Sequence, residues 1–62
     1  MKVHESITYE RVEDIIMNDE YIGLCTACGA ERECCEPDAH HYTCDECGEM
    51  AVFGAEELIF HV

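Results

Sequence analysis

The chain has 62 residues and a formal net charge of −12, with 15 acidic side chains and only 3 basic ones. A chain of this length forms at most one domain, and its small apolar core needs disulfides, a metal or a partner to be stable. The charge disfavours direct binding to nucleic acid, because phosphates repel it and Lys2, Arg11 and Arg32 are too scattered to form a basic patch. The same charge disfavours contact with anionic membranes.

The N-terminal part of the chain is predicted to contain one amphipathic helix. Residues 1–7 show no periodicity, and we expect a flexible N-terminus there. Residues 8–18 carry apolar side chains at helical spacing, and Ser6 or Thr8 can cap the start. We expect this helix to pack on the remaining domain, residues 22–62; the alternative is a docking face for a partner. The apolar stripe consists of Tyr9, Val12, Ile15 and Ile16.

Residues 22–62 are predicted to complete a small, metal-stabilised α+β fold. Strand candidates are residues 40–43 and 49–53, and Gly54 ends the second. Two alternatives remain open for residues 55–62, which can begin with one helical turn or alternate as a strand. The side chains that we expect in the core are Val12, Ile15, Ile16, Leu24, Tyr42, Val52, Phe53 and Leu58.

Four of the six cysteines have the spacing of a metal site. The pattern C-x2-C-x15-C-x2-C consists of Cys25, Cys28, Cys44 and Cys47, and it matches a known zinc spacing. Two cysteines on a tight turn bind one side of a tetrahedral ion, and the second turn binds the other side. A glycine follows each pair, where a positive φ permits the sharp turn. The sequence therefore predicts one Zn²⁺ per chain.

The expected compartment supports metal ligation over disulfide bonding. The sequence shows no secretory signal and no stretch of about 18 apolar residues, so we expect a cytoplasmic protein. Cysteines in a reducing cytoplasm are more often metal ligands than disulfide partners.

Two further cysteines and two histidines are predicted not to bind the metal. Cys34 and Cys35 are adjacent, so on an extended segment their side chains point to opposite faces. We expect one to be buried as a small apolar side chain and the other to be exposed; the alternative is a redox or intermolecular role. His40 and His41 are expected to lie on the surface, because four cysteines already complete the ligand shell.

The cysteine quartet with a glycine after each pair resembles a zinc ribbon, a module in which a small antiparallel sheet holds one zinc. The resemblance covers about residues 24–53 and implies no single function, since zinc ribbons bind nucleic acid or protein. The segments GLCTACGAE, EPDA, YTCDECG and FGAEELIF together resemble small zinc-ribbon proteins carried by phages and prophages. This resemblance implies the cytoplasm of a host cell if the protein is viral.

Binding to a macromolecule is the predicted function, and catalysis is not expected because a four-cysteine shell leaves no open position for a substrate. We expect a protein partner with a basic surface, and the carboxylates can act as a DNA mimic that regulates a DNA-handling or transcription protein. The alternatives are an acidity that serves only solubility or salt adaptation, a nucleic-acid-associated zinc ribbon, or an iron electron carrier similar to rubredoxin. The candidate partner-binding residues are Glu10, Glu13, Asp14, Glu31, Glu33 and Glu36.

Overall fold

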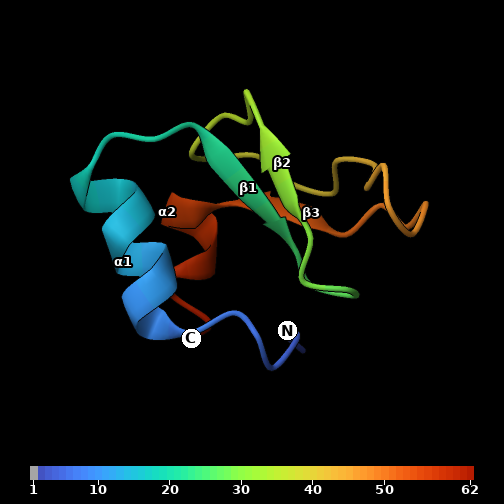
Figure 1. The fold of residues 1–62 in the computed structure, drawn as a ribbon, viewed down its shortest axis with the longest axis horizontal. Coiled ribbons are helices and arrows are strands. Elements are labelled where there is room, and N and C mark those ends of the chain that lie inside the picture. The colour runs from blue at the N-terminus through green and yellow to red at the C-terminus, as the bar shows by residue number, and fades with distance from the viewer. Residues whose placement is uncertain (1) are drawn as a thin grey trace.

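The structure, a computed structural model, describes residues 2–62 and shows two short helices and a three-stranded sheet (Figure 1). In chain order the elements are α1 (Tyr9–Met17), β1 (Ile22–Cys25), β2 (Glu31–Glu33), β3 (Val52–Gly54) and α2 (Ala55–Leu58). The strands pair antiparallel in the order β2-β1-β3, which places β1 at the centre. This arrangement confirms the expected small α+β fold with short antiparallel strands and an N-terminal helix.

Helix α1 begins and ends within one residue of the predicted range because both of its ends are capped. The Thr8 hydroxyl accepts a hydrogen bond from the Arg11 N–H (3.2 Å), as an N-cap side chain does. After the C-cap residue Asn18, Asp19 adopts a left-handed backbone (φ 53°) and its N–H donates to the Ile16 carbonyl (3.2 Å). Such a turn ends a helix and redirects the chain.

The apolar stripe of α1 faces the core, with one exception. Val12 and Ile15 are buried and Ile16 is partly buried, but Tyr9 is 52% exposed. Ile7, just before the N-cap residue, packs instead in the same cluster as Val12. A contact between the residue before the N-cap and the fourth helical residue is a hydrophobic staple. The last residue of the segment that was expected to be flexible is therefore part of the core.

The strand predictions need one correction. The candidate at residues 49–53 corresponds to β3, shifted toward Gly54, but residues 40–43 form no strand. Only Tyr42 pairs there, through two hydrogen bonds with Val52, each 3.0 Å long. The physical reason lies at His41, whose left-handed backbone (φ 53°) interrupts the extended conformation.

The C-terminal alternatives are decided in favour of the helix. Residues 55–58 form α2, and Phe60, which a strand would have directed inward with Leu58, is 82% exposed. Leu58 is fully buried, because the helical turn directs it toward α1 and the sheet.

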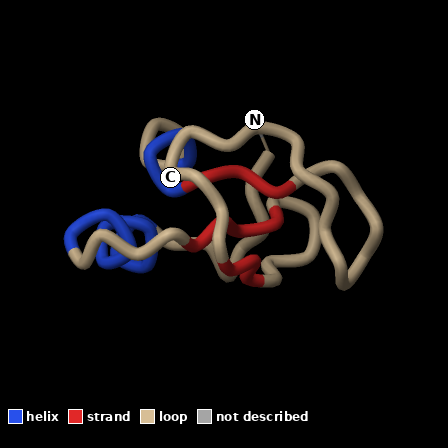
Figure 2. Tube along the Cα trace, turned by 90° about the horizontal axis from the view of Figure 1, so that it is seen from above, coloured by secondary structure: helices blue, strands red, loops and turns tan. Residues whose placement is uncertain are grey.

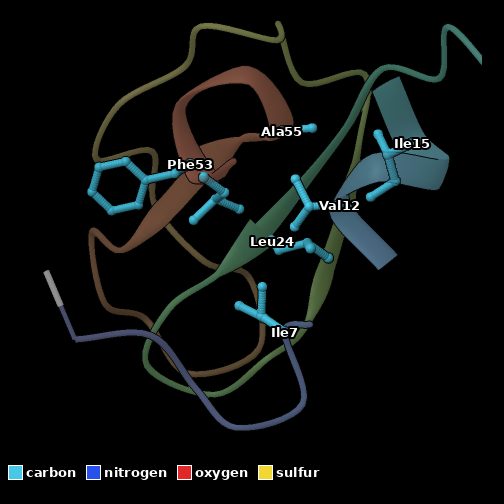
Figure 3. Packing of buried hydrophobic residues seen from close by; sticks show 7 residues of the cluster. Ile7, Val12, Ile15, Leu24, Phe53 and Ala55 are labelled. Carbon is cyan, nitrogen blue, oxygen red and sulfur yellow. The ribbon is translucent and has the colours of Figure 1, made fainter. Parts of the chain in front are cut away.

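The buried side chains form two clusters, and successive residues of β1 contribute to different ones. Leu24 belongs to the first cluster with residues of both helices (Figure 3). Cys25 belongs to the second cluster with Cys35 and Val52. Alternation along a strand explains this division. The predicted core is confirmed, with Ile16 and Tyr42 at its margin; the buried side chains not predicted individually are Ile7, Ala39 and Ala55.

The helices and the cysteine-bearing turns lie at opposite ends of the molecule. Both helices lie at one end in Figures 1 and 2, and the turns around residues 26–29 and 45–50 extend from the other end. The first cluster therefore joins the helices to the sheet, and the second supports the cysteines.

Replacing Gly54 with alanine is expected to lower the free energy of unfolding by about 3 kcal/mol, the upper part of the usual range for overpacking. An added Cβ would lie against the carbonyl oxygens of Glu36 and Pro37. These backbone atoms cannot move away without disturbing two hydrogen bonds. One runs from the Gly54 N–H to the Ala39 carbonyl (3.0 Å), the other from the Glu56 N–H to the Pro37 carbonyl (3.1 Å). Urea unfolding of the metal-loaded protein measures the effect.

Gly48→Ala is the control for this substitution. Gly48 has a positive φ (78°) but nothing within 4 Å of an added Cβ, so only the backbone cost of about 1 kcal/mol applies. Equal destabilisation by the two substitutions would contradict the steric explanation.

Candidate metal centre

The four cysteines predicted as ligands converge at one point. The sulfur atoms of Cys25, Cys28, Cys44 and Cys47 all lie within 4.8 Å of one another. Two sulfur–sulfur distances cross between the two turns, 3.7 Å from Cys25 to Cys47 and 3.6 Å from Cys28 to Cys44. A tetrahedral ion with bonds of about 2.3 Å to sulfur requires about 3.8 Å between its ligands. The cluster therefore has the dimensions of a four-thiolate metal site.

Each cysteine pair sits on the same backbone turn. In the first, the Gly29 N–H donates to the Cys25 carbonyl (2.8 Å); in the second, the Gly48 N–H donates to the Cys44 carbonyl (2.9 Å). Both glycines have positive φ angles, 80° and 78°. The Cys25 and Cys44 N–H groups in turn donate to the carbonyl five residues later, Ala30 in one case and Glu49 in the other. The repeat in the sequence is therefore a repeat in structure, and we call these turns the first and second knuckle.

Strand pairing brings the two knuckles together. Cys25 ends β1 and lies opposite Val52 of β3, and Val52 also pairs with Tyr42, just before the second knuckle. The Thr26 N–H and hydroxyl both donate to the Ala51 carbonyl (2.8 and 3.2 Å), which fixes the first knuckle to the chain leaving the second. The sheet thus aligns two turns that are separated by 15 residues in the sequence.

Arg32 supports the second knuckle from β2, a role that the sequence did not predict. Its guanidinium donates to the Thr43 carbonyl and lies 3.7 Å from the Asp45 carboxylate and 5.9 Å from the centre of the Tyr42 ring. No local pattern signals this role, because it depends on which segment β2 faces in the folded chain.

The pKa values of the thiols indicate what a bound cation would do at this site. A hydrogen bond from the Cys47 N–H is the main cause that lowers the pKa of Cys44 to about 7; desolvation opposes it and the Glu46 N–H adds to it. A hydrogen bond from the Ala30 N–H lowers the pKa of Cys28, but desolvation and the three neighbouring sulfurs raise it to about 12. Cys44 therefore ionises readily, whereas the neighbouring sulfurs make Cys28 harder to ionise. A divalent cation removes that repulsion.

The remaining cysteines and histidines lie where the sequence placed them. Cys35 is fully buried and Cys34 is exposed, as expected, although Cys34 has a left-handed backbone (φ 57°) and not the extended one that was assumed. Burial raises the pKa of the Cys35 thiol, so this residue behaves as an apolar core side chain. His40 and His41 are exposed and outside the sulfur cluster; His40 instead pairs with Glu57 at 3.2 Å.

The six carboxylates proposed for partner binding lie on α1, on β2 and in the loop after β2. Glu31 pairs with Arg11 (2.9 Å), and Glu36 accepts a hydrogen bond from the Tyr42 hydroxyl. This hydrogen bond raises the pKa of Tyr42. The other four carboxylates make no ion pair within residues 2–62 and are exposed or partly exposed. They lie on α1 and at the end of β2: Glu10, Glu13, Asp14 and Glu33.

The two knuckles and the sheet between them define a four-cysteine metal centre similar to that of a zinc ribbon. Compared with known proteins, the chain matches no family model, no curated protein and no solved structure. None of the helices formed by residues 2–62 has the length and hydrophobicity that crossing a bilayer requires.

Substituting serine for Cys25 or Cys47 is expected to abolish tight metal binding and to unfold the protein. Loss of a direct ligand should weaken binding by more than the roughly 10- to 100-fold that loss of a supporting residue causes. The variant Cys34→Ser/Cys35→Ala should retain about one metal per chain, because neither sulfur belongs to the cluster. Titration with Co²⁺ or Zn²⁺ under reducing conditions measures the stoichiometry, and metal loss from the double variant would overturn the ligand assignment.

Acidification is expected to release the metal and unfold the chain. The pKa of Cys44 is about 7 in the folded chain against an ordinary value of 9.0, so its contribution to stability is complete above about pH 9 and is lost as the pH falls through 7. Protons compete with the metal for all four thiolates, so metal release follows in the same direction. Circular dichroism with a zinc indicator measures both events; a Cys34→Ser control should show the same profile. Retention of fold without metal at acidic pH would contradict the coupling.

Proposed function

We propose that the protein is a zinc-binding module of the zinc-ribbon type whose acidic surface docks on a basic surface of another protein. The observation that carries this proposal is the closed four-sulfur cluster, which anchors a fold of formal net charge −12. The metal in this proposal is structural, and recognition belongs to the surface that the metal holds in shape.

Zinc is the proposed metal because thiolates in a tetrahedral array suit it and a structural site keeps no open position. Iron is the second candidate, since the same ligands serve in electron carriers similar to rubredoxin. Purified protein distinguishes them at once: a zinc protein is colourless, whereas an iron–thiolate protein is coloured. A non-catalytic role follows in either case from four cysteines that fill the coordination shell.

The charge distribution supports a basic partner over a nucleic acid. Two of the three basic side chains, Arg11 and Arg32, are engaged by carboxylates of the chain itself, at 2.9 and 3.7 Å. Four thiolates with one Zn²⁺ make the folded protein more negative still. A basic groove that normally binds phosphates can accept such a surface, so a DNA-mimic regulator of a DNA-handling or transcription protein is the form of the function that we favour. A nucleic-acid-associated zinc ribbon is the alternative.

The test is capture of partners from host-cell lysate by zinc-loaded protein, with metal content verified beforehand. We expect a specific basic protein that is retained by the folded form, is absent with the Cys25→Ser control, and is released as salt is raised from low to moderate concentration. Mass spectrometry identifies the captured protein. If the folded bait and the control recover the same background at both salt concentrations, the binding function is wrong.

A further inference from the structure

An apolar groove with an acidic rim lies at the start of β1, at the opposite end of that strand from the metal centre. It consists of two adjoining recesses that share Tyr21 and Pro37. The larger recess has a volume of about 410 Å³ and is completed by Cys34, Cys35 and Glu36. The smaller one extends between the end of α1 and the start of α2. We call the combined feature the Tyr21 groove.

Backbone hydrogen bonds fix the segments that form the Tyr21 groove. The Cys35 N–H donates to the Tyr21 carbonyl (3.0 Å), and the Glu56 N–H donates to the Pro37 carbonyl (3.1 Å). At the end of α1, the Glu20 N–H donates to the Ile15 carbonyl (3.1 Å). In Figure 1, the α1–β1 connection and the loop after β2 lie along the same edge of the molecule. The groove is therefore formed before any ligand binds, which reduces the entropy cost of binding.

Two side chains of the groove, Tyr21 and Cys34, are exposed although their backbone is fixed. Tyr21 is 65% exposed, and Cys34 is exposed because its left-handed backbone (φ 57°) turns it outward while Cys35 is buried beneath Gly23. An aromatic side chain held on a fixed backbone next to a proline is a ready contact for an apolar side chain of a partner.

The rim of the groove is acidic. Carboxylates of Asp19, Glu20 and Glu56 line the smaller recess, and Glu36 lines the larger one. None of the chain's basic side chains lines either recess. A phosphate or a carboxylate would be repelled here, and so would a second copy of this chain, which has a net charge of −12.

We propose that the Tyr21 groove binds a short segment of the partner protein in which one aliphatic or aromatic side chain is flanked by lysine or arginine. The apolar side chain packs between Tyr21 and Pro37, and the flanking cations pair with the carboxylates of the rim. A cation above the Tyr21 ring adds a further attraction. The proposal rests on the proposed function, which it deepens by locating the contact and by moving it away from the carboxylates of α1.

The probe is a short acetylated and amidated peptide with a central leucine flanked by lysines, titrated into ¹⁵N-labelled, zinc-loaded protein. We expect saturable amide shifts confined to residues 15–16, 19–21, 34–37 and 55–56. A peptide with serine at its centre should bind about tenfold more weakly, because burial of one leucine is worth about that factor. Equal binding of the two peptides, or shifts spread over α1, would overturn the proposal. Groove shifts that appear on concentrating the protein alone would overturn it in favour of self-association.

Two variants that remove equal charge separate the groove from general acidity. The groove variant is Asp19→Asn/Glu20→Gln/Glu56→Gln, and the matched control on α1 is Glu10→Gln/Glu13→Gln/Asp14→Asn. Both should keep one zinc per chain and an unchanged amide spectrum elsewhere. The groove variant should weaken binding of the leucine peptide several-fold more than the control does, because contact pairs are screened less than distant charges. Equal weakening by the two variants would show that net charge alone attracts the peptide, and it would overturn the groove proposal.

A third variant, Tyr21→Ser, tests the apolar contact. It should remove the preference for leucine over serine at the peptide centre while leaving the salt dependence of binding unchanged. Persistence of the leucine preference would show that the apolar contact lies elsewhere.

The same variants in lysate capture distinguish failure of the groove from failure of the proposed function. If the groove variant still captures the partner and the α1 control does not, the binding function is supported and the groove proposal is overturned. No specific capture by the wild-type protein at any salt overturns the function and the inference that rests on it.

Discussion

The structure depends on holding four cysteine sulfurs within 4.8 Å of one another, from two turns that are far apart in the sequence. Thiolates at that distance repel each other, so the arrangement favours a bound cation. Strand pairing brings the cysteines together, because Cys25 pairs with Val52, and Val52 pairs with Tyr42, two residues before Cys44. Strand pairing and metal coordination therefore reinforce the same contacts, which suits a chain too short for a large core.

The central strand β1 joins the two parts of the molecule because it is buried on both faces. Leu24 packs with the helices, through the cluster that includes Val12 and Leu58, whereas Cys25 packs with Cys35 and Val52. Gly23 lets Cys35 approach closely, since an added Cβ would lie 2.5 Å from its sulfur. The extra cysteine that binds no metal is thus a small apolar side chain beneath the strand that carries the first ligand. A metal bound at one end of β1 would therefore also stabilise the helix packing at the other.

This separation also organises the proposed function. The knuckles hold the four-sulfur cluster, and the Tyr21 groove at the far end of β1 combines the exposed Tyr21 side chain with a carboxylate rim. Charge attracts a basic partner from a distance, whereas an apolar contact in a fixed groove determines which basic segment stays bound. Acidic side chains are spread over the whole surface, whereas the groove is one defined site on it.

The sequence by itself determined the features whose signals are local. The spacing of Cys25, Cys28, Cys44 and Cys47 identified the sulfurs that the fold brings together, because a CxxC turn followed by glycine closes on itself. The helix at residues 8–18 was predictable for the same reason, since its cap and its apolar period lie within one segment. The division of Cys34 and Cys35 between surface and core was also expected, but the extended segment assumed for it ends at Glu33, and Cys34 has a left-handed backbone (φ 57°).

Only the tertiary structure decided the features that depend on contacts between distant segments. It showed which of the two adjacent cysteines is buried, directed Ile7 into the core in place of Tyr9, and made residues 55–58 a helix. It also placed Arg32 on the second knuckle and brought Tyr21 beside Pro37. Each of these outcomes depends on strand register and packing across the sheet, where the partner of a residue is set by the folded chain and not by its neighbours in the sequence.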